Sequence, residues 1–291
     1  MNLSIIVITF NSKKYIEDCI KHILLNLEDS SDCEIIVYDN NSKDNTIELI
    51  RGLNSNLIKV ISSKSNLGYS KAINSCMLES QFENIMILNP DAIMKPDTIS
   101  KLLEALSFED VGVVGPKVLN DDGSFQLSSR RHFPTFGVMF SYFFLLNKIF
   151  PKNKFFGKYN YTFIDENNLT DVDAVSGACM MFRKTIYSNL RGFDESFFMY
   201  FEDTDFCVRV KSLGYRVIYY PEAEVLHLND YMDNYDIKIV SFYKSLERFI
   251  EKHKSKIYFS FLISIAAKII RHFSYIKRII YLKYNYKTNN E

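Results

Sequence analysis

Along the first 120 residues, short β-branched runs alternate with segments whose apolar residues recur every three or four positions. The runs are typical of buried strands and the spaced segments of amphipathic helices. The predicted strands cover residues 4–10, 34–39, 58–62, 84–89 and 111–118, and the predicted helices lie near 16–27, 44–53, from about 69, and from Ile99 onward. This alternation predicts an α/β fold with a mostly parallel central sheet and helices on both faces.

The pattern changes after residue 120. Glycine, asparagine, aspartate and aromatic residues mix between about 120 and 170, and a strand is predicted again over residues 173–184. A further helix is predicted over residues 203–213, because it has an apolar stripe, an i, i+4 pair of Asp205 with Arg209, and a glycine directly after it.

The charge of the chain is balanced overall but unevenly distributed. The sequence has 35 Lys and Arg and 35 Asp and Glu; from Lys252 onward nine bases face one acid, which leaves 26 of the bases and 34 of the acids in the first 251 residues. We expect residues 231–291 to form a basic amphipathic helical extension on an anionic membrane surface, with a plain solvated helix as the alternative. The acidic body argues against nucleic acid as a partner.

Two apolar stretches, residues 133–147 and 257–267, are shorter than the roughly 20 residues that a helix needs to cross a bilayer. They are suited to lie on a membrane without spanning it. The amino terminus lacks the features of a secretory signal, and the five scattered cysteines show no paired spacing, which fits a reducing compartment. We therefore expect a cytoplasmic protein that lies peripherally at the inner face of the cell membrane.

Polar residues follow three of the predicted parallel strands. Thr9 and Asn11 end the first, Asp39 ends the second and Asp91 follows the fourth. Ligands of such sheets bind at the carboxyl ends of the strands, and one or two carboxylates beside a diphosphate can hold Mg²⁺ or Mn²⁺. Turn and capping chemistry explains the same residues and stays open. Neither GxGxxG nor GxxxxGK[ST] is present, so a nucleotide would be held by another device.

The stretch FFMYFEDTDF, residues 197–206, places acids directly behind aromatic residues. Asp203 is a candidate helix N-cap, and the helix dipole favours Glu202 next to it. Alternatively, the acids are held against an apolar wall because they do chemistry, while the aromatic rings exclude water. The residues alone leave both explanations open.

Six sequence blocks occur in order between about residues 3 and 228: VITFN (7–11), YDNNSKDNT (38–46), NLGYSKAIN (66–74), LNPD (88–91), SGACMMFRK (176–184) and GFDESFFMYFEDTDFCVRVKSLGY (192–215). Each block is weak, but the ordered set is highly specific. The chain resembles the inverting glycosyltransferases of family 2, in their rhamnosyltransferase-like branch. The resemblance implies a GT-A catalytic domain over residues 1–230, with a nucleotide-binding half over 1–120 and an acceptor half over 121–230.

The resemblance also implies roles for individual residues. Asp203 would be the catalytic base with Glu202 as its neighbour, and Asp91 would bind Mg²⁺ or Mn²⁺ with His227 as a further ligand. Five residues would bind the nucleotide: Thr9, Asn11, Asp39, Asn66 and Gly68. The chain departs from the family pattern where Asn89 replaces the first acid of the DxD-like motif, and after His227, where the usual glycine and serine are missing. A packing or hydrogen-bonding role for His227 stays open.

The function implied is inverting transfer of a sugar from a nucleoside-diphosphate-sugar to a lipid-linked glycan acceptor, in the synthesis of a cell-surface polysaccharide. One carboxylate suffices, because a diphosphate leaving group needs a metal rather than a general acid. Arg130 and Arg131 precede an apolar stretch and are candidates for binding an acceptor phosphate. The alternative is a non-catalytic sugar-nucleotide or membrane-binding protein with the same fold. A nucleotidyltransferase is disfavoured, because the first strand is not followed by a glycine-rich loop.

Overall fold

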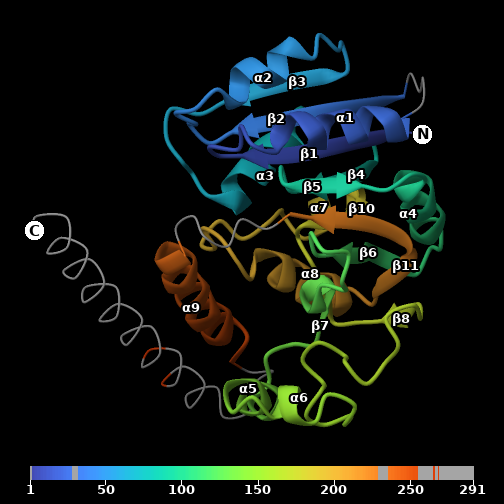
Figure 1. Cartoon of the computed structure of the whole chain (residues 1–291), viewed down its shortest axis with the longest axis vertical. Helices are drawn as coiled ribbons and strands as arrows, with labels where there is room; N and C mark the ends of the chain where they lie inside the picture. Colours follow the sequence, from blue (N-terminus) through green and yellow to red (C-terminus); the bar gives the residue numbers. More distant parts are fainter. Residues whose placement is uncertain (1, 28–31, 229–234, 255–264, 266–267, 269–291) are drawn as a thin grey trace, which may run out of the picture.

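The computed structural model describes residues 2–27, 32–228, 235–254, 265 and 268 of the chain. In this part, nine strands form one sheet with the order β3-β2-β1-β4-β10-β6-β11-β5 and with β8 paired to β11 (Figure 1). The strands are β1 (Leu3–Thr9), β2 (Cys33–Asp39), β3 (Ile58–Ser62), β4 (Asn84–Leu88), β5 (Ala92–Met94), β6 (Val111–Leu119), β8 (Thr170–Asp171), β10 (Cys179–Arg183) and β11 (Arg216–His227). A separate ribbon pairs β7 (Arg130–Arg131) with β9 (Ala174–Val175).

The helices flank the sheet and extend below it in Figure 1. They are α1 (Ile16–Leu27), α2 (Thr46–Gly52), α3 (Tyr69–Glu79), α4 (Thr98–Leu106), α5 (Phe136–Phe143), α6 (Leu146–Ile149), α7 (Lys184–Asn189), α8 (Glu202–Ser212) and α9 (Tyr235–Lys252), with a short 3-10 helix at Leu127–Ser129.

Six strands of the large sheet run in the same direction. Strand β1 is parallel to β2 and β4, β2 is parallel to β3, and β6 is parallel to β11. Strand β10 is antiparallel to both β4 and β6, so these two point the same way. The predicted mostly parallel sheet is therefore confirmed, and the carboxyl ends of β1, β2, β4 and β11 lie at one edge.

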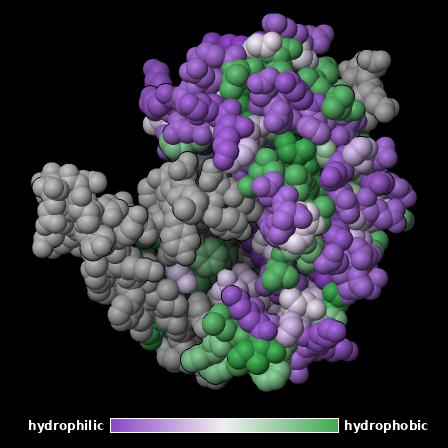
Figure 2. All heavy atoms as spheres, viewed as in Figure 1, coloured by the Kyte–Doolittle hydropathy of each residue, from purple (hydrophilic) through white to green (hydrophobic). Residues whose placement is uncertain are grey.

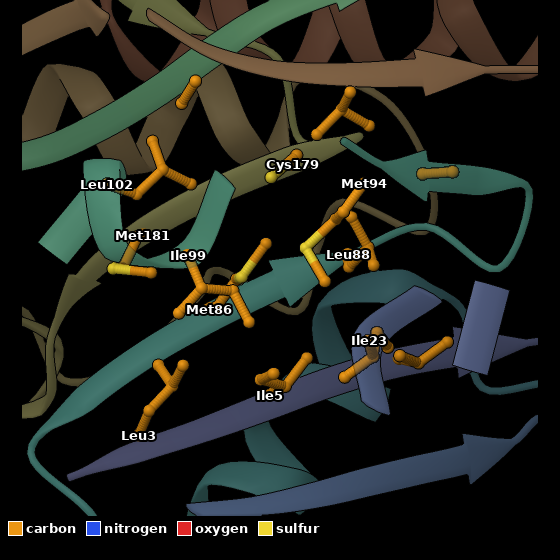
Figure 3. Packing of buried hydrophobic residues seen from close by; sticks show 14 of the residues in the cluster. Leu3, Ile5, Ile23, Met86, Leu88, Met94, Ile99, Leu102, Cys179 and Met181 are labelled. Carbon is orange, nitrogen blue, oxygen red and sulfur yellow. The ribbon is translucent and has the colours of Figure 1, made fainter. Parts of the chain in front are cut away.

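The sheet is buried on both faces, which explains its near-continuous apolar runs. Along β1, Ile5 and Val7 pack with α1, α2 and α4, whereas Ile6 and Ile8 pack with α3, α7 and α8. Figure 3 shows the first of these faces, where Met86 and residues of neighbouring strands lie against side chains of α1 and α4. The alternation follows from the period of two in a strand. Both faces of the sheet are therefore covered by helices.

The strand predicted over residues 173–184 is interrupted. Its first part, β9, pairs with β7, whereas its second part, β10, pairs with β4 and β6. Gly177 lies in the break, and a Cβ atom there would be 3.2 Å from Oδ2 of Asp203. The prediction of one strand was wrong because the two halves join different sheets. The helix predicted over 203–213 is α8, and Gly214 follows it at φ 91°.

Helix α9 lies in the predicted basic extension and packs against the rest of the chain. Leu246, Phe249 and Ile250 of α9 join a buried cluster with Phe197 and Phe201, the residues that precede α8. Most of the extension after α9 lies outside the described residues, including six of its eight Lys and Arg. No helix among the described residues is both long and apolar enough to span a bilayer.

Candidate active site

The first two parallel strands place their terminal polar residues side by side. Thr9 and Asp39 are register partners at the ends of β1 and β2. The Asp39 carboxylate accepts hydrogen bonds from the backbone N–H of Ser42 at 3.0 Å and from its hydroxyl at 2.5 Å, which folds the loop after β2. Thr9 is fully buried, whereas Asn11 is exposed and bonded to the same loop through Ser42 and Lys43. Asn11 and the loop therefore face a ligand more directly than Thr9 does.

The loop before α3 also lies at this edge of the sheet, where it contacts Asn40 after β2. The side-chain amide of Asn40 bonds Leu67 N–H at 3.0 Å and the Gly68 carbonyl at 3.4 Å, and Asn66 Oδ1 accepts the Gly68 N–H at 3.0 Å. Gly68 has φ 86°, and a Cβ atom there would lie 2.6 Å from Cδ2 of Phe198 and 2.7 Å from the Phe198 carbonyl oxygen. Only glycine fits this conformation and this contact.

Asp91 and His227 come together because β11 pairs with β5. His227 is the register partner of Ala92, the residue after Asp91, and its Nε2 lies 3.1 Å from Oδ1 of Asp91 and 3.2 Å from Nδ2 of Asn89. Gln126 approaches the other ring nitrogen of His227 at 3.3 Å. Burial disfavours an ionised Asp91, but the hydrogen bond and charge of His227 outweigh this and hold the pKa of the Asp91 carboxyl below its usual value.

Tyr69, the first residue of α3, connects these loops. Its hydroxyl lies 3.0 Å from Oδ1 of Asn89 and 3.1 Å from the carbonyl oxygen of Gly177, and Gly177 N–H donates to Oδ2 of Asp203 at 2.8 Å. Burial and the nearby acids, Glu202, Asp203 and Asp91, raise the pKa of Tyr69 well above its usual value. A continuous set of contacts therefore runs from the Asp91–His227 pair through Asn89 and Tyr69 to Asp203.

The Asp203 carboxylate is held from three sides. In addition to Gly177, Arg131 Nη2 lies 2.5 Å from Oδ2, and the backbone N–H of Thr204 donates to Oδ1 at 2.6 Å. Burial disfavours the charge on Arg131, but Asp203 outweighs it and the pKa of the guanidinium is raised. Helix α8 begins at Glu202, with Phe201 at the cap position, so Asp203 is not the N-cap. The alternative that Asp203 only caps the helix is therefore excluded.

Glu202 precedes Asp203 and has a different environment. Its side chain is buried, and its Oε2 has no hydrogen-bond partner among the described residues. Burial, together with the charge of Asp203, raises the pKa of Glu202 to about 8. Glu202 thus keeps its proton to a higher pH than an exposed glutamate does, and the protonated carboxyl group can donate a hydrogen bond.

The two arginines that the sequence groups together have different surroundings. Arg130 is 1% exposed and donates to the carbonyl oxygens of Tyr161, Ile164 and Asp165, with its guanidinium over the ring of Tyr219. Through these contacts Arg130 holds residues 161–165 against Tyr219 of β11. Arg131 instead reaches Asp203 and the carbonyl of Val175, and so lies in the acidic site.

The aromatic residues before α8 also differ in how exposed they are. Phe197 and Phe201 are core residues, at 1% and 2% exposure, whereas Phe198 is 49% exposed beside Gly68. Tyr200 and Phe201, directly before α8, both have positive φ, 70° and 66°, which is uncommon for aromatic residues. Phe198 is therefore the most exposed ring of this segment, and Tyr200 is partly exposed.

Asp91 and His227 are suited to bind a divalent cation that also contacts a diphosphate. Such a cation is commonly bound through one or two protein side chains plus phosphate oxygens of the substrate. The described residues contain no group of three or more His, Cys, Asp and Glu side chains that could hold a metal by themselves. A cation held by Asp91 and His227 would therefore need further ligands from a substrate.

Sequence reasoning missed Tyr69, Gln126 and the contact of Arg131 with Asp203. Tyr69 lies in a sequence block that was singled out, NLGYSKAIN, and this was the available signal. Gln126 and the Arg131 contact had no signal in the pattern, because each depends on a partner more than 70 positions away.

The chain resembles known proteins over most of its length. The family model described as "Glycosyl transferase family 2" matches residues 4–191. The chain is 28% identical over 239 residues to the N-acetylglucosaminyl-diphospho-decaprenol L-rhamnosyltransferase of Mycobacterium tuberculosis, covering 77% of this chain and 75% of that protein. It is 28% identical over 221 residues to the rhamnosyltransferase WbbL of Escherichia coli, covering 72% and 79%.

Among solved structures, the mannosyltransferase PcManGT of Pyrobaculum calidifontis in complex with GDP-Man and Mn²⁺ matches with a TM-score of 0.63 and 18% identity. The match covers 93% of this chain and 70% of that one. The likeness shows that the sheet and its helices have the GT-A fold.

Proposed function

Because the chain belongs to glycosyl transferase family 2, we propose that it transfers a sugar, with inversion, from a nucleoside-diphosphate-sugar to a lipid-linked glycan acceptor. The observation that carries the proposal is the set of contacts from Asp91 and His227 to Asp203. It joins residues suited to a diphosphate with a carboxylate suited to a base, at the sheet edge where ligands of parallel sheets bind.

The donor is proposed to lie between the loops of β1, β2 and α3. Asn11, Asp39 and the Asn66–Gly68 loop would contact the nucleotide, and Thr9 would support the end of β1. Asp91 and His227 would hold Mg²⁺ or Mn²⁺, which when bound neutralises charge on the diphosphate leaving group. The exposed ring of Phe198 is proposed to pack against the donor.

Asp203 is proposed to accept the proton of the acceptor hydroxyl. The oxygen then bonds to the anomeric carbon, while the bond between that carbon and the diphosphate oxygen breaks and the nucleoside diphosphate leaves with the electron pair. Arg131 and the Gly177 N–H fix the orientation of the carboxylate, which keeps the base in reach of the nucleophile. Glu202, whose pKa is raised by burial and by the charge of Asp203, is proposed to donate a hydrogen bond to a sugar hydroxyl while it is protonated.

The lipid-linked acceptor is supported by the name of the mycobacterial relative, an N-acetylglucosaminyl-diphospho-decaprenol L-rhamnosyltransferase. Action on such an acceptor would bring the protein to the cytoplasmic face of a membrane, during synthesis of a surface polysaccharide. The donor sugar is left open, since relatives of this fold bear the names of rhamnosyl- and mannosyltransferases.

A panel of nucleotide sugars tests the proposal. Thermal unfolding is measured with each donor and Mn²⁺ or Mg²⁺, and a ligand at about 100 times its Kd stabilises the fold by about 2.7 kcal/mol. Donors that raise Tm are then assayed for hydrolysis and for transfer to a polyprenyl-diphosphate acceptor. Binding without turnover of any donor would indicate a non-catalytic binding protein, and no binding at all would remove the proposed donor site.

A further inference from the structure

The segment between Arg131 and Asp165 has an unusual composition. Residues 132–164 include twelve Phe and Tyr and four lysines, and they contain no Asp, Glu or Arg. In a chain whose acids and bases are equal in number, this is a local excess of positive charge beside a local excess of aromatic surface. Helices α5 and α6 and the loop after them are built from it.

Much of this aromatic and aliphatic surface is exposed. Phe144, Ile149 and Phe155 are each at least 60% exposed. With their exposed neighbours they form what we call the apolar patch: Phe140, Phe144, Leu145, Ile149, Phe150 and Phe155. Figure 2 shows hydrophobic residues gathered over α5 and α6 at the bottom of the molecule.

The members of the apolar patch touch one another or share neighbours. The rings of Phe140 and Phe144 have centroids 4.6 Å apart, and Phe156 lies 5.6 Å from Phe150 and 5.4 Å from Phe155. The Phe155 ring also lies against α5, since a Cβ atom at Gly137 would be 3.5 Å from its Cζ. The patch is therefore one surface built from two helices and a loop.

Exposed lysines alternate with the patch residues along the chain. Lys148, Lys152, Lys154 and Lys158 are all exposed, and none of them forms an ion pair within the described ranges of the chain. Exposed aromatic and aliphatic side chains next to unpaired lysines match the interfacial region of an anionic membrane, where rings enter the headgroup boundary and lysines meet lipid phosphates.

The inner side of the same element contacts the proposed catalytic helix. Val138 and Met139 of α5 are buried in one cluster with Phe201 and with Val208 of α8. The segment also begins directly after Arg131, which pairs with Asp203. Helix α5 therefore carries part of the apolar patch on its exposed side and packs on its inner side against α8, which carries the proposed base.

From this arrangement we infer that the apolar patch and its four lysines form the surface by which the protein lies on an anionic lipid bilayer. A second copy of the chain suits the patch less well, because a two-fold contact would bring the same four lysines of each copy together without an acid between them. The proposed function supplies only the reason for membrane binding, which is that a lipid-linked acceptor lies in the bilayer. Bilayer binding itself is measured without turnover and can be tested separately.

Co-sedimentation of the full chain with vesicles tests this inference. Vesicles of phosphatidylcholine alone are compared with vesicles that contain about one third phosphatidylglycerol, an amount that creates a negative surface potential. The double variant Phe144→Ser/Ile149→Ser removes apolar area, and Lys148→Glu/Lys152→Glu reverses charge. The matched controls are Leu25→Ser/Leu78→Ser and Lys71→Glu/Lys95→Glu, at exposed positions elsewhere.

We expect the wild type to bind the anionic vesicles, and each patch variant to bind at least about tenfold more weakly, because both apolar insertion and charge contribute. The control variants should stay within about twofold of the wild type, and donor-induced shifts in Tm should be unchanged in all four. Vesicle binding that the patch variants retain in full overturns the inference. A concentration-dependent dimer that Phe144→Ser/Ile149→Ser abolishes would assign the patch to a second copy instead.

Discussion

Nε2 of His253, the residue that follows α9, lies 2.8 Å from Oδ1 of Asp205 in the first turn of α8. Asp205 is fully buried and also contacts Arg209 and Lys252, each at 2.8 Å. Burial favours a neutral Asp205, but the hydrogen bond from His253 and the charges of Arg209 and Lys252 outweigh this and lower its pKa. The end of α9 is thereby tied to the helix that carries the proposed base.

Replacing Asp205 with Ala should destabilise the protein by about 3–5 kcal/mol, because it leaves buried positive groups without their partner. His253→Ala should cost about 1–3 kcal/mol. Urea unfolding followed by circular dichroism measures both. Arg248→Ala is the control on α9, since Arg248 is half exposed and should cost less than about 1 kcal/mol. Equal losses at all three positions would show that α9 is not tied through Asp205.

Asp203→Asn should lower the rate of sugar transfer by about 10²–10⁴-fold, the range that a general base contributes. Asn keeps the size and hydrogen-bonding oxygen of Asp, so donor binding measured by thermal shift should change by less than about twofold. Asp122→Asn, at an exposed turn, is the control. Transfer at near wild-type rate in Asp203→Asn would remove Asp203 from the base role.

Arg131→Met should lower kcat by about tenfold or more and leave KM for the acceptor nearly unchanged, because Arg131 holds the Asp203 carboxylate at 2.5 Å. In the Asp203→Asn background the same change should add little further loss, since the two residues act together. A rise in KM for a diphosphate-linked acceptor, additive with Asp203→Asn, would instead support the phosphate-binding role expected from the sequence. Arg216→Met, at an exposed ion pair, is the matched control.

Gly68→Ala should weaken donor binding and destabilise the fold by about 1–3 kcal/mol, since a Cβ atom there meets the Phe198 carbonyl oxygen at 2.7 Å in a backbone with φ 86°. Gly123→Ala is a closely matched control, because Gly123 has φ 79° and no atom within 4 Å of an added Cβ. The difference between the two variants measures the close approach alone. Equal effects would assign the whole loss to backbone strain.

The stability of the metal-free protein should depend on pH through Glu202. Its pKa is raised to about 8 in the folded state, against about 4.3 when unfolded. Between these two pH values the folded state binds a proton that the unfolded state has lost. The stabilisation that Glu202 contributes to the folded state is therefore complete below about pH 4.3 and is lost as the pH rises to about 8. The free energy of unfolding of Glu202→Gln, relative to that of the wild type, should therefore rise with pH across that window, by at most about 1.4 kcal/mol per pH unit. A constant difference between the two from pH 5 to 8 would contradict the raised pKa.

The sequence alone determined the layered α/β fold, because the spacing of apolar residues decides locally whether a segment can bury one stripe, one face or two faces. It also determined that Asp39 and Asp91 follow parallel strands, and the carboxyl ends of parallel strands meet at one edge. The i, i+4 pair of Asp205 with Arg209 was predicted for the same reason, since helix geometry alone brings the two together.

Only the tertiary structure decided the contacts between distant segments. Sheet order and register bring His227 to Asp91, the break at Gly177 turns an N–H toward Asp203, and Arg131 reaches Asp203 across 72 positions. Hydrophobic periodicity shows which face a residue occupies and says nothing of its partner on a neighbouring element. The acids at the start of α8 were visible in the sequence, but the difference between the paired Asp203, the buried Glu202 and the structural Asp205 comes from what the folded chain places around each.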